Sequence, residues 1–263
     1  MAFLDKLEKA IDKFYALLPR QKPNEELIVN TKVIAHRGAH NPSQGIVENT
    51  LLAFDRAVEL GSWGIEFDVQ CTADGVPIVH HDLDFKRLFQ RDERIDQIKW
   101  AQFENMLPEV PTLEQVIETY RHKQKLFIEI KESFNQYDKL VSLLSHLKPT
   151  EDYYIISLDE ASLRPLKLIP REAQLLIPVH NNVKKFCQFA LEKSYGGVLG
   201  HYLFLTNRQI QRLILANKIY GVGFVESKFS LYREVSRHIP WIFTNNVADV
   251  MQWLEKLKAE NLG

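Results

Sequence analysis

The sequence predicts an α/β fold built on parallel strands, arranged either as a closed barrel or as an open, doubly wound sheet. From residue 33 onward, short apolar runs alternate with segments of helical periodicity, and this alternation is typical of parallel α/β domains. The chain has 263 residues, 45% hydrophobic and 25% charged, which fits one large globular domain. Several apolar runs end in charged residues. In a barrel these strand ends form the active-site face.

Nine strand-like runs follow one another along the chain, whereas a closed barrel needs eight strands. The runs span residues 33–38, 63–70, 76–82, 126–131, 153–159, 174–180, 196–202, 220–226 and 240–246. The second and third are separated only by residues 71–75, which is too short for a crossover helix. Asp74 and Gly75 in this linker favour a tight turn. We therefore expect an antiparallel pair here, while the sequence leaves open which of the nine runs lies outside the barrel.

Helical periodicity is clearest in residues 48–61. Asn49 and Thr50 are expected to cap this helix, and Gly61 to end it. Similar patterns occupy residues 111–121, 135–147 and 208–218.

Residues 3–18 form a separate amphipathic pattern before the first strand. Apolar residues recur there at spacings of three and four, and two prolines in residues 19–26 end the pattern. We divide the chain into an N-terminal helical extension and linker, residues 1–31, and a barrel domain, residues 32–263. The helix is expected to pack outside the domain or across one end. Weak contact with a membrane surface is the alternative, although its polar face mixes both signs of charge.

Composition excludes several classes of protein. Lys and Arg number 33 against 34 Asp and Glu, for a net charge of −1, which argues against a nucleic-acid partner. Two cysteines, Cys71 and Cys187, cannot form a disulfide framework. The apolar runs are far shorter than the ~20 residues of a membrane span, and the first residues do not resemble a signal peptide. The expected location is therefore cytoplasmic, and the oligomeric state is left open.

Four consecutive strands carry charged groups at or near their ends. The first ends in His36 and Arg37, and the third in His80, His81 and Asp82. The second and fourth carry Glu66 with Asp68 and Glu129 with Lys131. Strand side chains alternate, so residues two apart share a face. Each of these two pairs therefore points one way from an otherwise apolar strand.

Several buried carboxylates are costly unless a positive group neutralises them. Oxygen ligands without a nearby cysteine favour one hard divalent cation, Mg²⁺ or Ca²⁺. Ordinary salt bridges are the alternative: Arg37 could pair with Glu66 and Asp68, and Glu129 with Lys131 could be a partly exposed edge pair. Four such strand ends in sequence favour a functional site.

The segment AHRGAHNPSQGIVENTLLAFDRAVELGSWGIEFDVQCTADGVPIVHHD, residues 35–82, resembles the glycerophosphodiester phosphodiesterase family. It contains the succession HRG, ENT, ExD and TxDGxPIVxHD. A weaker resemblance continues through Arg87 and residues 111–116, 127–131 and 155–159, and ends at residues 242–246. It covers about residues 32–250. The resemblance implies a TIM-type (β/α)8 barrel that hydrolyses glycerophosphodiesters to sn-glycerol 3-phosphate and an alcohol in lipid and glycerol metabolism.

The resemblance also implies roles for single residues. His36 and His81 match the catalytic histidine pair of the family, and Arg37 and Lys131 match groups that face the phosphate. Glu66, Asp68 and Glu129 match the metal ligands. Glu48 of the ENT motif lies near this site in the family.

Other polar residues near the motifs are expected to have structural or supporting roles. His80 and His81 are adjacent and face opposite sides of a strand, so His80 is expected to be structural. His40 is expected on a solvated loop. Asp82 is expected to orient a histidine or hold a turn.

Two departures from the family pattern concern specificity. Where the family often has Trp-Thr-Val-Asn in the seventh barrel strand, this chain has residues 223–226, with Phe224 as the aromatic and Glu226 in place of the amide. We expect a carboxylate there to change the surroundings of the leaving group. The family's Thr-Asp pattern in the eighth strand is Thr244-Asn245 here.

Two other functions remain open at this point. One is a lysophospholipase D-like or sphingomyelinase D-like enzyme acting on a lysolipid, for which Tyr202, Phe204 and Phe224 would contact the tail, although such aromatics more often pack in a core. The other is a non-catalytic barrel that only binds its ligand. An intact set of histidines and carboxylates argues against the second.

Overall fold

The computed structural model describes residues 13–14, 17–179 and 182–261. Eight parallel strands close into a barrel, because β1 pairs with both β2 and β9. Ile34 of β1 lies opposite Gly64 of β2 on one side and Phe243 of β9 on the other. The barrel strands are β1 Lys32–His36, β2 Gly64–Cys71, β4 Lys125–Ile130, β5 Tyr153–Ser157, β6 Gln174–Leu176, β7 Gly197–His201, β8 Ile219–Gly223 and β9 Trp241–Thr244. The predicted TIM-type barrel is confirmed.

The ninth run, β3 Pro77–Val79, lies outside the barrel. It pairs antiparallel with the end of β2, with Val69 opposite Val79. The turn between them forms as predicted: Gly75 has φ 74°, and the Asp74 carboxylate accepts hydrogen bonds from Thr72 Oγ1 and Trp100 N. The third run is therefore the extra one.

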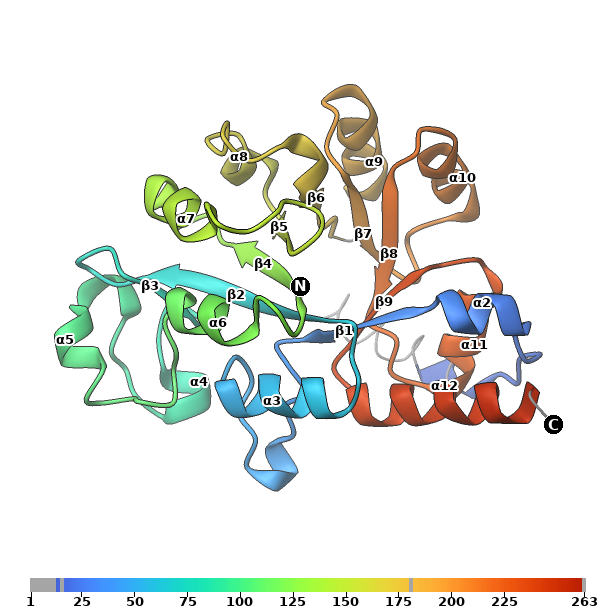
Figure 1. The fold of residues 1–263 in the computed structure, drawn as a ribbon, viewed down its shortest axis with the longest axis horizontal. Helices are drawn as coiled ribbons and strands as arrows, with labels where there is room; N and C mark the ends of the chain where they lie inside the picture. The colour runs from blue at the N-terminus through green and yellow to red at the C-terminus, as the bar shows by residue number, and fades with distance from the viewer. Residues whose placement is uncertain (1–12, 15–16, 180–181, 262–263) are drawn as a thin grey trace.

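Helices surround the barrel (Figure 1). The four predicted helices are α3 Leu51–Glu59, α6 Leu113–Tyr120, α7 Tyr137–Leu144 and α10 Asn207–Leu215. Thr50 caps α3 by accepting from Ala53 N, and Gly61 follows its end with φ 76°. The others are α2 Glu25–Asn30, α4 Lys86–Phe89, α5 Trp100–Phe103, α8 Glu160–Leu163, α9 Val183–Glu192, α11 Lys228–Ser236 and α12 Val247–Asn261, with short 3₁₀ turns at Pro42–Gln44, Ile95–Gln97 and Arg171–Ala173.

The strands alternate between two apolar layers. On β2, Ile65, Phe67 and Val69 face the core between strands and helices, while Phe127 of β4 belongs to a second cluster inside the barrel. Glu66 and Asp68 have the opposite parity to Ile65 and point inward. The barrel interior is thus apolar over most of its length and charged at the carboxyl ends of β2 and β4.

Residues 77–110 form an excursion with a small core of its own, made by Ile78, Phe85, Ile95, Phe103, Leu107 and Val110. In Figure 1 its helices α4 and α5 lie together beside β3, away from α9 and α10.

Most of the predicted helix 3–18 lies outside the described residues. The described part of the extension includes α2, which packs against α12 and α11, and Ile28 is fully buried in the main core. The division at residue 31 remains a prediction. Within the described residues, no helix is long and apolar enough to cross a membrane.

Candidate active site

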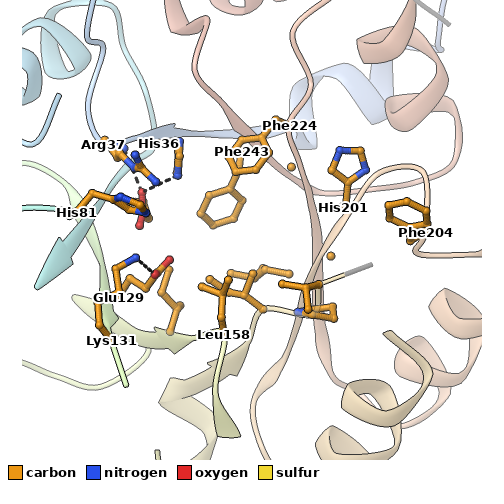
Figure 2. A pocket seen from close by; sticks show the side chains of 18 residues that line it. His36, Arg37, His81, Glu129, Lys131, Leu158, His201, Phe204, Phe224 and Phe243 are labelled. Atoms are coloured by element: carbon orange, nitrogen blue, oxygen red, sulfur yellow. Dashed lines mark hydrogen bonds and ion pairs between the residues drawn. The ribbon is translucent and has the colours of Figure 1, made fainter. Parts of the chain in front are cut away.

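A cavity of about 300 Å³ opens at the carboxyl ends of the barrel strands (Figure 2). Six charged or ionisable residues line one side of it, and we call this side the charged wall: His36, Arg37, Glu66, His81, Glu129 and Lys131. They come from the ends of β1, β2 and β4 and from the loop after β3. Asp68, the next inward-facing residue of β2, does not line the cavity but contacts Lys131 and Arg37, which do. The structure therefore brings together all seven of the principal residues singled out in the sequence.

Glu66, Asp68 and Glu129 form a buried acidic cluster. One oxygen of each lies within 4.8 Å of the others, and the residues are 1%, 0% and 5% exposed. Among the described residues, Glu66 Oε1 has no hydrogen-bond partner although it is buried. An unpartnered carboxylate oxygen facing two further carboxylates fits a hard divalent cation, and an all-oxygen donor set suits Mg²⁺ or Ca²⁺ better than zinc. The cluster could hold such an ion.

The carboxylates of this cluster titrate differently because their neighbours differ. Burial, together with Asp68 and Glu129, raises the pKa of Glu66 well above its ordinary value. Burial and Asp68 raise the pKa of Glu129 to about 7. Burial would also raise the pKa of Asp68, but Lys131 and Arg37 outweigh it and hold that pKa below the ordinary range. Fully ionised, the three carboxylates would carry more negative charge than Arg37 and Lys131 neutralise, and the raised pKa values of Glu66 and Glu129 reflect this surplus.

Two cations lie directly against the acidic cluster. Lys131 Nζ forms ion pairs with Asp68 and Glu129. Arg37 Nε lies 3.0 Å from Asp68 Oδ2, and the backbone N–H of Arg37 donates to Glu66 Oε2 at 3.0 Å. Because both cations also line the cavity, they can bind an anion that enters it.

The HRG sequence fixes the direction of Arg37. Arg37 has φ 55° and Gly38 φ 77°, so the chain reverses immediately after β1. A side chain at position 38 would meet backbone atoms of Ala53 at 2.8 Å. Glycine is therefore required there both by conformation and by the close approach of α3. The left-handed Arg37 directs its backbone N–H at Glu66, and such strained residues are common at functional sites.

His36 belongs to a chain of three polar side chains. Its Nδ1 lies 2.7 Å from Asn245 Oδ1, and Asn245 Nδ2 donates to Glu226. A carboxylate only accepts hydrogen bonds, so Glu226 holds the amide with its oxygen toward His36. The hydrogen of His36 then lies on Nδ1, and Nε2 keeps its lone pair, 3.7 Å from Glu66 Oε2. Burial and Arg37 lower the pKa of His36 to about 3, which keeps the ring neutral.

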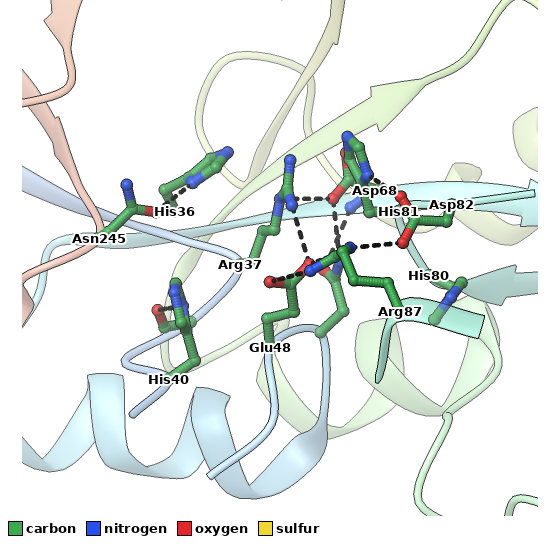
Figure 3. A network of polar contacts seen from close by, with 12 residues as sticks. His36, Arg37, His40, Glu48, Asp68, His80, His81, Asp82, Arg87 and Asn245 are labelled. Atoms are coloured by element: carbon green, nitrogen blue, oxygen red, sulfur yellow. Dashed lines mark hydrogen bonds and ion pairs between the residues drawn. The ribbon is translucent and has the colours of Figure 1, made fainter. Parts of the chain in front are cut away.

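The second histidine, His81, belongs to another chain of contacts (Figure 3). His81 Nδ1 lies 2.7 Å from Asp82 Oδ1, and Arg87 Nε donates to Asp82 Oδ2 at 2.6 Å. Arg87 also donates to both oxygens of Glu48, at 2.7 and 3.1 Å. Glu48 in turn accepts from Arg37 Nη1 at 2.8 Å. One arginine from α4 therefore connects the supports of His81 and of Arg37.

These contacts also affect ionisation. Burial opposes ionisation of Glu48, but hydrogen bonds and charge from Arg87 and Arg37 outweigh it and lower the Glu48 pKa to about 2. Burial lowers the pKa of His81, and the Asp82 contact partly opposes this.

The remaining predicted residues lie as follows. His80 is buried, with its Nε2 3.1 Å from the carbonyl oxygen of Asp84 and its ring 5.0 Å from that of Phe85, a structural position. His40 does not line the cavity, and its Nδ1 is 3.3 Å from Gly38 O. Phe224 lines the cavity and packs edge-on against His36 at 4.5 Å between ring centroids. Glu226 is exposed, outside the cavity lining, and contacts Asn245.

The predicted capping role of Asn49 is wrong. Thr50 alone caps α3, whereas the Asn49 side chain donates to Asp68 Oδ2 at 2.9 Å and accepts from Asp68 N at 3.3 Å. Asn49 is 1% exposed and has φ 59°, a conformation that asparagine tolerates better than most residues. Two further contacts were not predicted from the sequence: Asn245 as a partner of His36, and Arg87 as a bridge between Glu48 and Asp82. The signal for both was their position inside the family-like segments.

The fold and the site define a class of protein: a (β/α)8 barrel whose strand ends bear an acidic cluster, two cations and two histidines. Residues 36–150 match the profile of the glycerophosphoryl diester phosphodiesterase family. These residues are therefore similar to that family, and the barrel around them has the fold of its solved structures.

Named relatives point to the same similarity. The chain is 37% identical over 155 residues to a glycerophosphodiester phosphodiesterase of Caldanaerobacter subterraneus, covering 53% of this chain and 63% of that protein. It is 30% identical over 124 residues to human glycerophosphodiester phosphodiesterase 1, covering 42% and 35%. The chain thus matches less than two thirds of the length of these relatives.

Solved structures cover more of the chain. A glycerophosphodiester phosphodiesterase from Thermotoga maritima superposes with a TM-score of 0.70 at 25% identity, over 84% of this chain and 97% of its own. A phosphodiesterase from Oleispira antarctica, solved with the product sn-glycerol-3-phosphate, superposes with a TM-score of 0.70 at 20% identity, over 85% and 96%. At 20% identity, the similarity to the Oleispira structure shows the fold alone.

Proposed function

We propose that this protein hydrolyses a glycerophosphodiester to sn-glycerol 3-phosphate and an alcohol, with the help of one divalent cation. The observation that carries the proposal is the charged wall together with Asp68 next to it, where three buried carboxylates, two cations and two histidines meet at one cavity. The product bound to the Oleispira structure supports the choice of substrate.

The cation would be held by Glu66, Asp68 and Glu129, whose surplus negative charge fits a hard ion. When bound, it supplies positive charge that stabilises the phosphoryl oxygens in the transition state. Arg37 and Lys131 act on the same oxygens. Their side chains line the cavity next to the cluster, and they offset the charge that otherwise repels a nucleophile from a phosphodiester.

The two histidines move the protons. His36 is neutral, with Nε2 available to take the proton of the attacking oxygen. His81 has the Asp82 carboxylate at Nδ1, an arrangement that stabilises the protonated ring, so we assign it the delivery of a proton to the leaving alkoxide. Water or a hydroxyl of the substrate can be the attacking group in this scheme.

The test is release of choline from glycerophosphocholine by the purified protein, after EDTA and after return of Mg²⁺ or Ca²⁺. We expect turnover that needs the cation. His81→Ala should lower kcat at least about 100-fold, with the circular dichroism spectrum unchanged. His122→Ala, an exposed histidine away from the site, is the matched control and should keep full activity.

A barrel that only binds its ligand would show none of this turnover while still binding the cation. Full activity in EDTA would contradict the role of the acidic cluster, and full activity of His81→Ala would contradict the histidine assignment.

A further inference from the structure

The cavity has a second side that is chemically unlike the charged wall. We call it the apolar wall, and its members come from β5 to β9 and the segments that follow them: Leu158, Ile177, Val179, Phe204, Phe224 and Phe243. Figure 2 shows the charged residues gathered on one side, Leu158 and Phe243 in the middle, and Phe204 with His201 at the far side.

Three residues of the apolar wall expose an unusual amount of hydrocarbon. Leu158 is 41% exposed, Val179 39% and Phe224 39%. Single exposed apolar residues are ordinary on protein surfaces. These three, however, lie on three different strand ends and line the same cavity. Tyr202, by contrast, is buried in the main core and serves packing.

The apolar wall offers little to a polar substrate group. Among the described residues that line the cavity on this side, the only polar side chain is that of His201, next to the apolar wall, and its Nδ1 accepts a hydrogen bond from Leu203 N at 3.2 Å. A hydroxyl-rich or charged group placed against this wall would lose its hydrogen bonds to water without replacement. A hydrocarbon would lose nothing and would cover the exposed side chains.

We infer that the apolar wall binds a single alkyl or acyl chain attached to the phosphodiester, so that the substrate class is a single-chain phospholipid. The inference rests on the proposed function for the bond that is cleaved. The phosphate lies against Arg37 and Lys131, and the chain runs from it across the cavity. A volume of about 300 Å³ is at the lower end for ligand pockets. The chain therefore leaves the barrel over Leu158, Val179 and Phe224.

The first measurement is binding, which does not depend on catalysis. Hexyl-, octyl- and decylphosphocholine, each below its micellar concentration and in EDTA, are titrated into the protein by calorimetry. Each added methylene that contacts the apolar wall should tighten Kd about fourfold, from ~0.8 kcal/mol per buried CH₂. An affinity that does not change with chain length would overturn the inference.

The second measurement compares hydrolysis of two diesters that release the same alcohol. Choline release from glycerophosphocholine and from a lysophosphatidylcholine with an eight-carbon chain is followed in the presence of Mg²⁺ or Ca²⁺. We expect a kcat/KM at least tenfold higher for the lysolipid. A preference for glycerophosphocholine would overturn the inference and leave the proposed function intact. Binding that strengthens with chain length, without turnover of either diester, would support the inference and contradict the proposed function.

Variants locate the effect on the apolar wall. The double variant Leu158→Asn with Val179→Asn should lower the lysolipid-to-glycerophosphocholine ratio of kcat/KM at least fivefold. Leu168→Asn, at a loop position that is 79% exposed and outside the cavity lining, is the matched control and should keep the ratio of the unchanged protein. An equal loss of preference in Leu168→Asn, or none in the double variant, would contradict the assignment of the chain to this wall.

Discussion

Two buried glutamates, Glu66 in the site and Glu160 in α8, have opposite surroundings. Both are almost fully buried, at 1% and 5% exposed. Glu160 accepts hydrogen bonds on both oxygens, from Arg164 at 2.6 and 2.9 Å and from Lys193 and Tyr195 at 3.0 and 2.8 Å. Glu66 has one oxygen without a partner among the described residues and two carboxylates nearby.

The pKa shifts express this difference. Burial opposes ionisation of both, but the partners of Glu160 outweigh it and lower its pKa to about 2, whereas the neighbours of Glu66 add to the effect of burial and raise its pKa. Burial of a carboxylate is therefore no sign of function by itself. A buried carboxylate left with surplus negative charge points to a cation, and a fully partnered one points to structure.

The largest effect that tests this comparison is expected from Glu66→Gln. Loss of a cation ligand should lower kcat about 10³-fold, or ~4 kcal/mol of transition-state stabilisation. Without added metal the variant should be more stable than the unchanged protein by about 1 kcal/mol, because the cost of burying a carboxyl group with a raised pKa and an unpartnered oxygen is removed. Activity assays and urea unfolding in EDTA measure both. If Glu66→Gln were less stable than the unchanged protein in EDTA, the contrast between Glu66 and Glu160 would be contradicted.

Addition of the cation gives the complementary measurement. At 100 times Kd, Mg²⁺ or Ca²⁺ should stabilise the unchanged protein by about 2.7 kcal/mol, and Glu66→Gln should respond much less. Equal stabilisation of both proteins would mean that the ion binds elsewhere.

The next effect concerns Arg87, which supports Glu48 and Asp82 together. Arg87→Met should lower kcat/KM about 10–100-fold, the usual range for residues that orient site groups. Arg91→Met is the control from the same excursion, since Arg91 pairs with Glu93 away from the cavity. Full activity of Arg87→Met would contradict this positioning role, and a lowered Tm with full activity would give Arg87 a structural role like that of the partners of Glu160.

Glu160→Gln tests the structural side of the comparison. We expect a loss of about 1–2 kcal/mol at pH 7, modest because Arg164 and Lys193 are partly exposed to solvent, and no loss of kcat. A carboxylate whose folded pKa is lowered stabilises above its unfolded pKa of about 4.5. The difference between the two proteins should therefore shrink as the pH falls from 4.5 toward 2. Urea midpoints at several pH values measure this, and a difference that grows on acidification would contradict it.

The smallest effect is expected from Glu226→Gln. A glutamine side chain can donate as well as accept, so the Asn245 amide is no longer held with its oxygen toward His36. We expect kcat/KM to fall about fivefold, or ~1 kcal/mol, with stability unchanged. Glu109→Gln, an exposed position away from the site, is the control. An unaltered kcat/KM would leave the orientation of Asn245 to other groups.

Local patterns predicted the parallel α/β fold and the charged strand ends, and the family resemblance implied that the sheet closes into a barrel. Alternation with period two places Glu66 and Asp68 on one face whatever surrounds them, and a five-residue linker excludes a crossover helix. The turn at Gly75 and the cap at Thr50 also depend only on nearby residues. These predictions needed no knowledge of distant contacts.

The parts that failed or were missed depend on segments far apart in the chain. Asn49 looked like a helix cap, but its bond to Asp68 spans 19 residues. Arg87 reaches Glu48 across 39 residues, and His36 reaches Asn245 across 209. Each strand end contributes only one or two apolar residues to the apolar wall, so no local sequence pattern predicts this wall. Only the closed barrel brings them together.

The excursion of residues 77–110 has a consequence for the order of unfolding. Its small core is separate from the main one, so it can open as a cooperative unit while the barrel remains folded. Backbone amides of α4 and α5 are therefore expected to exchange hydrogen with solvent sooner than those of β2 and β4. Because Arg87 lies in α4 and His81 and Asp82 lie in the same excursion, each such opening would take these residues away from Glu48 and Arg37, and the lifetime of the assembled site would be that of the excursion.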